Sequence, residues 1–140
     1  MLNKNWTPDL MKETDSHWSN LKLPTGENIS HSDAERLMLK LQEASIEWAD
    51  HLVNATYFHQ MAEVKTKSLF SMAFLSSDGK SDRQKETIAK SNIEVKNAEI
   101  KEKEAEAHLL FAKLRYDDAV RSHHAIKKIF EVAASERKYL

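Results

Sequence analysis

The sequence predicts an all-α protein built around a long antiparallel helical hairpin. Gly and Pro, which turn the chain between β-strands, number only 2 each among 140 residues, whereas 31% of the residues are charged, as in long helices. Apolar residues recur at intervals of three and four over two long stretches, which is the helical period. We therefore expect helices over about 32–75 and 81–137, preceded by an irregular N-terminal arm.

The arm, residues 1–30, holds both prolines and one of the two glycines, and its apolar residues follow no sustained period. Residues 31–140 are expected to form the hairpin and oligomerisation domain. Because tryptophan is costly to leave in water, Trp6 and Trp18 predict that a short amphipathic turn over 8–18 docks on a neighbour or on the chain's own helices. The alternative is a partly disordered tail.

The first helix is expected to begin at Ser32, which forms a capping box with Glu35, so that each side chain satisfies a backbone N–H group of the first turn. The Ser-Ser-Asp-Gly run over 76–79 is the strongest turn signal in the chain and ends this helix. The apolar residues between these points share one helical face. They are Leu37, Leu41, Ala44, Trp48, Leu52, Ala55, Phe58, Ala62, Leu69 and Ala73.

The second helix is expected to restart at a capping box formed by Ser81 and Gln84. A third such pair, Ser91 with Glu94, predicts a joint near residue 91. Two helices of matching length joined by a short turn must lie antiparallel.

The second helix carries two apolar stripes. We expect the first stripe to pack against the first helix. Its members are Ile93, Ile100, Ala107, Phe111, Leu114, Ala125, Ile129 and Val132. The second stripe consists of Leu109, Ala112, Tyr116, Ala119, Ile126, Phe130 and Ala133. One partner helix cannot bury both stripes, so the second stripe predicts oligomerisation. Asp118 and Arg121 interrupt the first stripe and, three residues apart, are expected to pair.

The sequence offers few candidate sites for catalysis or metal binding. The chain has no cysteine, which excludes disulfides and thiolate zinc sites, and no Gly-rich phosphate loop or nucleophile elbow. His51 shares a helix face with Glu47 and with His59, but this spacing alone is a weak metal signal. We therefore expect no enzymatic activity, no cofactor and no metal. Neither a signal peptide nor a membrane segment is visible, so the expected location is the cytoplasm.

Charge is nearly balanced overall, with 21 basic and 22 acidic residues, so nucleic-acid binding would have to come from local clusters. Basic residues gather near the expected turn and in the last third of the chain, with Phe74, Tyr116, Phe130 and Tyr139 among them. Such clusters can grip phosphates and stack bases, as in single-strand binders. The alternative is an ordinary solvated helix surface.

The segment 121–129, Arg-Ser-His-His-Ala-Ile-Lys-Lys-Ile, resembles the Arg-x-x-x-Ala-Ile-Lys-x-Ile stretch near the end of the UvsY-type recombination mediators of T-even and related phages. The length and layout are also similar. The resemblance implies a homo-oligomer, such as a ring, that binds single-stranded DNA and helps to load a RecA-like recombinase onto DNA coated by single-strand-binding protein. In a phage-encoded protein the location would be the host cell cytoplasm.

The resemblance also implies roles for particular residues. Self-association is expected to involve Arg121, Ala125, Ile126, Ile129, Phe130 and Ala133. The DNA-binding residues are expected to be Lys65, Lys67, Lys80, Arg83 and Lys85 around the turn, with Lys127 and Lys128 near the C-terminus. The alternative function is a virion assembly or scaffolding protein, or a helical inhibitor of a host complex, that binds protein only. A plain homodimeric coiled coil is a third hypothesis.

Overall fold

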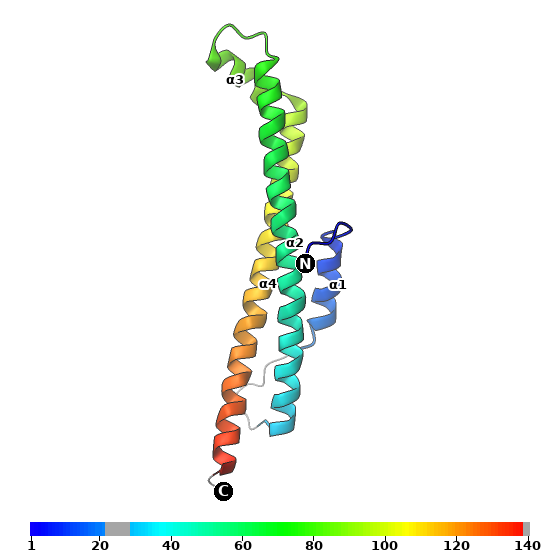
Figure 1. The fold of residues 1–140 in the computed structure, drawn as a ribbon, viewed down its shortest axis with the longest axis vertical. Coiled ribbons are helices and arrows are strands. Elements are labelled where there is room, and N and C mark those ends of the chain that lie inside the picture. Colours follow the sequence, from blue (N-terminus) through cyan, green and yellow to red (C-terminus); the bar gives the residue numbers. More distant parts are fainter. Residues whose placement is uncertain (22–28, 139–140) are drawn as a thin grey trace. The chain divides into compact units, whose positions relative to one another are not determined.

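A computed structural model describes residues 1–21 and 29–138, and every regular element in these two ranges is an α-helix (Figure 1). The prediction of an all-α, hairpin-like fold is confirmed. None of the described helices is long and apolar enough to cross a membrane. The helices are α1 (Asp9–Trp18), α2 (His31–Leu75), α3 (Asp82–Ser91) and α4 (Ile93–Lys138).

The chain forms two compact units. The first consists of Met1–Val53 with Phe111–Leu140, and the second of Asn54–Leu110. The long helices α2 and α4 contribute to both. Within each unit they run antiparallel, because residue numbers on α4 fall as those on α2 rise. In the first unit the ring centroids of His31 and Phe130 lie 4.4 Å apart, and those of Trp48 and Phe111 lie 5.7 Å apart.

The first long helix begins slightly before the predicted cap. Ser30, not Ser32, caps α2: its side-chain oxygen accepts from the Asp33 N–H at 3.1 Å and its carbonyl from the Ala34 N–H at 2.9 Å. Ser30 also lies three residues before an acidic residue, and the sequence alone does not decide between two overlapping serine caps.

The turn and the joint of the second unit follow the sequence more closely. Ser81 caps α3, its oxygen accepting from the Gln84 N–H at 3.2 Å. The expected joint lies between α3 and α4, but its cap is Asn92, whose side-chain oxygen accepts from the N–H groups of Glu94 and Val95 at 2.9 and 3.2 Å. Asn92 has an extended backbone, which breaks the helix there.

The assignment of the two α4 stripes was wrong. The second stripe, expected to remain for a partner copy, supplies the buried residues Ala112, Ala119 and Ile126, whereas Leu114 and Val132 of the first stripe are exposed. Among the described residues, seven of the 13 buried hydrophobic side chains are alanines, which let helix axes approach closely. The second stripe therefore forms the contact within the chain, whereas Leu114 and Val132 of the first stripe remain outside.

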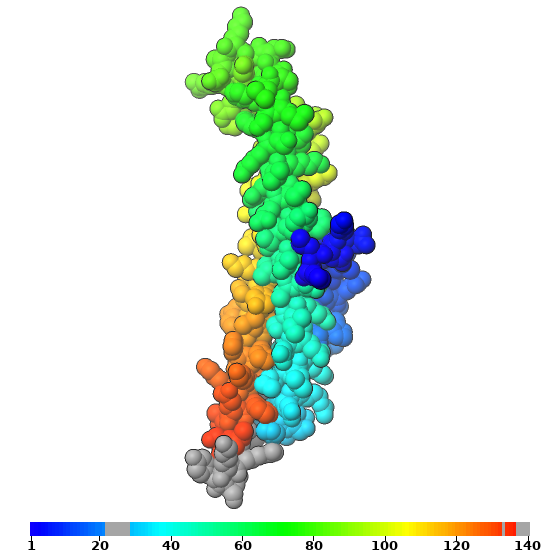
Figure 2. All heavy atoms as spheres, viewed as in Figure 1, coloured from blue at the N-terminus to red at the C-terminus, as the bar shows by residue number. Residues whose placement is uncertain are grey.

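The N-terminal arm docks on the chain's own helices, and Figure 2 shows α1 lying against the first-unit part of α2. Trp6 and Met11 are buried. The indole N–H of Trp18 donates to Glu47 Oε2 at 2.7 Å, and Arg115 Nε of α4 lies 2.8 Å from Asp15 Oδ1. These contacts choose between the two sequence hypotheses, docking and a disordered tail, in favour of docking.

His51 of α2 lies at the centre of the contact between α2 and the docked arm. Its Nδ1 accepts from the Trp6 indole N–H at 3.0 Å, and its Nε2 lies 2.7 Å from Thr14 Oγ1. An Nδ1 that accepts is unprotonated, so the ring is neutral and its Nε2–H donates to Thr14. Burial lowers the pKa of His51, while the nearby carboxylates of Glu47 and Asp50 oppose this shift. The docked arm therefore stabilises the neutral form of the His51 imidazole.

Candidate nucleic-acid interface

The basic residues around the turn belong to the second unit. Lys80 and Arg83 are exposed and line one shallow hollow together with Asp78, Gln84 and Thr87. Lys80 precedes the Ser81 cap and Arg83 lies in the first turn of α3, so both flank a helix N-terminus, whose partial positive charge favours anions. This hollow has the charge and the exposure that a phosphate contact needs.

Among the described basic residues around the turn, only Lys90 forms an ion pair with a nearby carboxylate. Residues 64–93 carry six basic and three acidic side chains. Lys90 pairs with Glu86 at 2.9 Å, and this hydrogen bond lowers the pKa of Glu86. Among the described residues no carboxylate lies within ion-pair distance of Lys80, Arg83 or Lys85. These three positive charges are available to an external anion.

The predicted DNA-binding residues do not form one cluster. Lys65 and Lys67 are exposed on α2, eight or more residues before its end at Leu75, which is about 12 Å or more along the helix. Lys65 lines a separate hollow with Lys101. Lys127 and Lys128 are exposed on α4 in the first unit. Of the expected set, the structure thus places Lys80 and Arg83 in one hollow, with Lys85 half-buried over the Phe74 ring of the same turn region.

Of the aromatic rings expected to stack on bases, Phe74 and Phe130 already pack within the chain. Phe74 stacks on Phe70, with centroids 6.4 Å apart, and Lys85 Nζ lies 6.0 Å from the Phe74 centroid. Phe130 packs against His31. Tyr116 is half-buried, and Tyr139 lies outside the described residues. The available contacts at the turn are therefore cationic, which favours binding to phosphates over stacking on bases.

The expected self-association residues are divided between the core and the surface of the first unit. Ile126 has no exposed surface and Phe130 is half-buried, so these two stabilise the chain's own fold. Ala125 and Ile129 are exposed, and Arg121 pairs with Asp118 at 3.2 Å, as the sequence predicted. The side chain of Ala133 lies outside the described residues.

A second set of exposed apolar residues, not predicted from the sequence, lies on α2. In the first unit these are Leu39, Ile46 and Val53, spaced by seven, which places them on one helix face. In the second unit they are Tyr57, Met61, Val64, Met72 and Leu75. The heptad spacing was visible in the sequence. It was overlooked because another face of α2 gives a longer unbroken apolar run.

No protein-family model matches this chain, and no curated protein or solved structure matches it. What the protein does must therefore be inferred from its own residues.

Proposed function

We propose that this protein is a recombination mediator of the phage type: an oligomer that binds single-stranded DNA and helps to load a RecA-like recombinase onto DNA coated by single-strand-binding protein. The observation that carries the proposal is the pair of exposed cations Lys80 and Arg83 at the turn, with no described carboxylate in ion-pair distance. The resemblance of segment 121–129 supplies the recombination context.

Binding at this site is electrostatic. Because the nearby Phe74 ring is already packed against Phe70 and Lys85, the turn offers charge and little free aromatic surface. Phosphate contacts of this kind release counterions, so affinity falls steeply with salt and depends little on base sequence. Each copy contributes only a few cations, which gives weak binding by itself.

Assembly supports the proposal because several weak sites on one strand bind with high avidity. In the first unit, Leu39, Ile46 and Val53 on α2 and Leu114, Ile129 and Val132 on α4 are all exposed. Clusters of exposed large apolar residues usually mark contact surfaces. A contact between α2 of one copy and α4 of the next joins unlike surfaces, and such head-to-tail contacts generate rings when the rotation closes.

The test is a salt titration of binding to a fluorescently labelled oligo(dT) strand, followed by polarisation. On single strands the logarithm of the binding constant changes with the logarithm of salt by about 0.7 per phosphate contacted. Replacing both Lys80 and Arg83 with alanine should therefore reduce the slope by about 1.4 for each copy that contacts the strand, and weaken binding at low salt.

The matched control replaces Lys4 and Lys12 with alanine, because these exposed arm residues carry the same charge and Lys12 already pairs with Asp9 at 3.6 Å. The control should bind as the unaltered protein does. Equal slopes for the unaltered protein and the turn variant, with unchanged circular dichroism, would reject the turn as the DNA contact.

The second candidate is a virion assembly or host-inhibitory protein that binds protein only. The exposed apolar residues on α2 and α4 favour it as well, because they suit a protein partner without any DNA. The same titration separates the two functions. Absence of binding to the labelled strand even at low salt supports the protein-only function and excludes the mediator.

A further inference from the structure

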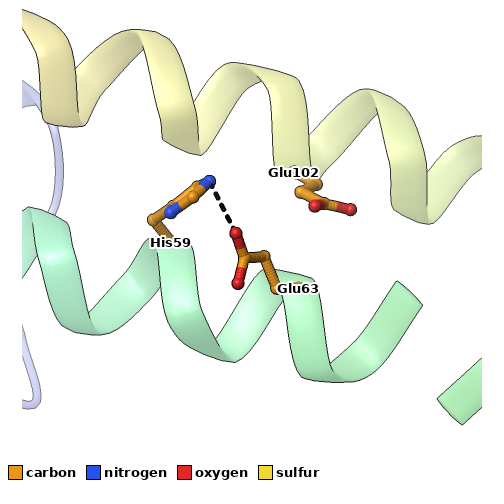
Figure 3. A group of neighbouring side chains, drawn as sticks. All are labelled: His59, Glu63 and Glu102. Atoms are coloured by element: carbon orange, nitrogen blue, oxygen red, sulfur yellow. Dashed lines mark ion pairs between the residues drawn. The ribbon is translucent and has the colours of Figure 1, made fainter. Parts of the chain in front are cut away.

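A polar cluster lies between the two long helices of the second unit. His59 and Glu63 extend from α2 and Glu102 from α4, and Figure 3 shows the three side chains pointing into the space between the helices. One nitrogen or oxygen atom from each residue lies within 4.8 Å of the other two. His59 Nε2 and Glu63 Oε1 are 3.5 Å apart.

These residues occupy core-facing positions. Glu102 follows the buried Val95 and Ala98 by seven and four residues, and His59 follows the buried Ala55 by four, so each shares a face with buried apolar neighbours. All three are half-buried, and the His59 side chain is only 17% exposed. Charged and polar side chains seldom occupy core-facing positions, so this cluster calls for a physical explanation.

The cluster lacks a positive charge. Its two carboxylates contribute two negative charges, and His59 pairs with Glu63 only when it is protonated. In the described parts of the chain, no lysine or arginine lies within ion-pair distance of Glu63 or Glu102. A neutral imidazole beside two carboxylates is the form in which these residues bind a metal ion.

We propose that His59, Glu63 and Glu102 bind a divalent transition-metal ion of the zinc class. One imidazole nitrogen and two carboxylate oxygens are common zinc ligands, with water completing the coordination. Metal–ligand bonds of about 2.1 Å place tetrahedral ligand atoms roughly 3.4 Å apart. The existing distances, at most 4.8 Å, close to that value by small side-chain rotations. The bound ion links α2 to α4 within the second unit.

The inference is independent of DNA binding, because it concerns a different set of residues. A sequence search for metal ligands could not find it. His59 and Glu63 alone are an ordinary pair on one helix. The third ligand, Glu102, lies on another helix, 43 positions after His59 in the chain. The cluster exists only because of the register between α2 and α4.

The experiment uses the full chain, freed of metal by dialysis against a chelator. Zn²⁺ affinity is measured by competition with a chromophoric chelator, and the ligand set by the absorption bands of bound Co²⁺. We expect His59→Ala and Glu102→Gln each to weaken Zn²⁺ binding by at least about tenfold and to abolish the Co²⁺ bands. Glu102→Gln keeps the size of the side chain and one acceptor oxygen while removing the charge, so it retains the fold.

The matched control is His124→Ala, which removes an exposed imidazole from α4 in the first unit and should leave Zn²⁺ affinity unchanged. A second readout is thermal unfolding, since an ion that binds only the folded state raises the melting temperature. Zn²⁺ should raise it for the unaltered protein and not for Glu102→Gln. Absence of binding, or equal affinities of the unaltered protein and Glu102→Gln, would overturn the proposal.

Discussion

Truncation of Ile126 tests which stripe of α4 forms the core. Ile126 has no exposed surface, and Ile126→Ala removes three carbons from a closed site. At about 0.8 kcal/mol per buried carbon the transfer loss is about 2.4 kcal/mol, and the cavity brings the total to roughly 3–4 kcal/mol. The same substitution at Ile100, 57% exposed on the other stripe, should cost about 1 kcal/mol, less a few tenths for the better helix propensity of alanine.

Both variants are measured by urea unfolding, followed by far-UV circular dichroism. All samples need the same protein concentration, because self-association makes apparent stability concentration-dependent. The expected result is a loss of unfolding free energy at Ile126 roughly four to five times that at Ile100. Equal losses, or a larger loss for Ile100→Ala, would mean that the first stripe forms the core and that the described packing of α4 is incorrect.

Two further predictions concern the arm and the turn. Because His51 accepts from Trp6 as a neutral ring with a lowered pKa, arm docking should be strongest above about pH 6.5 and weaken as pH falls through that lowered pKa. Tryptophan fluorescence should report this change, and His51→Gln should lack it; identical pH profiles would contradict the role of His51. Gly79→Ala should destabilise the fold by about 1–3 kcal/mol in urea unfolding, because the added Cβ would lie 2.8 Å from the Lys85 backbone nitrogen. Ser76→Ala, exposed in the same turn, should change stability by under about 0.5 kcal/mol.

Much of the fold was predictable because its signals are local. The turn over 76–79, the cap at Ser81 and the joint near residue 91 each depend on residues within a few positions of one another, and each lies at or next to its predicted place. Docking of the arm was also predictable, because Trp6 and Trp18 cannot remain in water at low cost. The residues that the arm contacts could not be predicted from the sequence, because the contacts with His51 and Glu47 join residues up to 45 positions apart.

The two stripes of α4 could not be distinguished by periodicity, because both have the spacing of a helix face. Apolar size did not decide between them either, because both stripes mix alanine with large side chains. Leu114 and Ile100 would bury more surface than alanine if they faced the other helix. Ala112 and Ala119 face the interior instead, where their small side chains let the helices approach. The choice depends on the fit between two surfaces, so it needs the partner helix as well as α4. A stripe rich in alanine opposite another alanine-rich face, such as Ala44 and Ala55, favours close packing.

Close packing of this kind also explains why a polar cluster can form between two helices. His59 and Glu102 lie equally far in sequence from the bond between Lys80 and Ser81, as do His31 and Phe130 in the first unit. A hairpin centred on that bond therefore places each pair at one level, and small neighbours such as Ala55 and Ala98 let polar side chains from both helices meet. The predicted turn over 76–79 is centred three positions earlier, which would pair His59 with Lys96, so the sequence alone does not place Glu102 opposite His59.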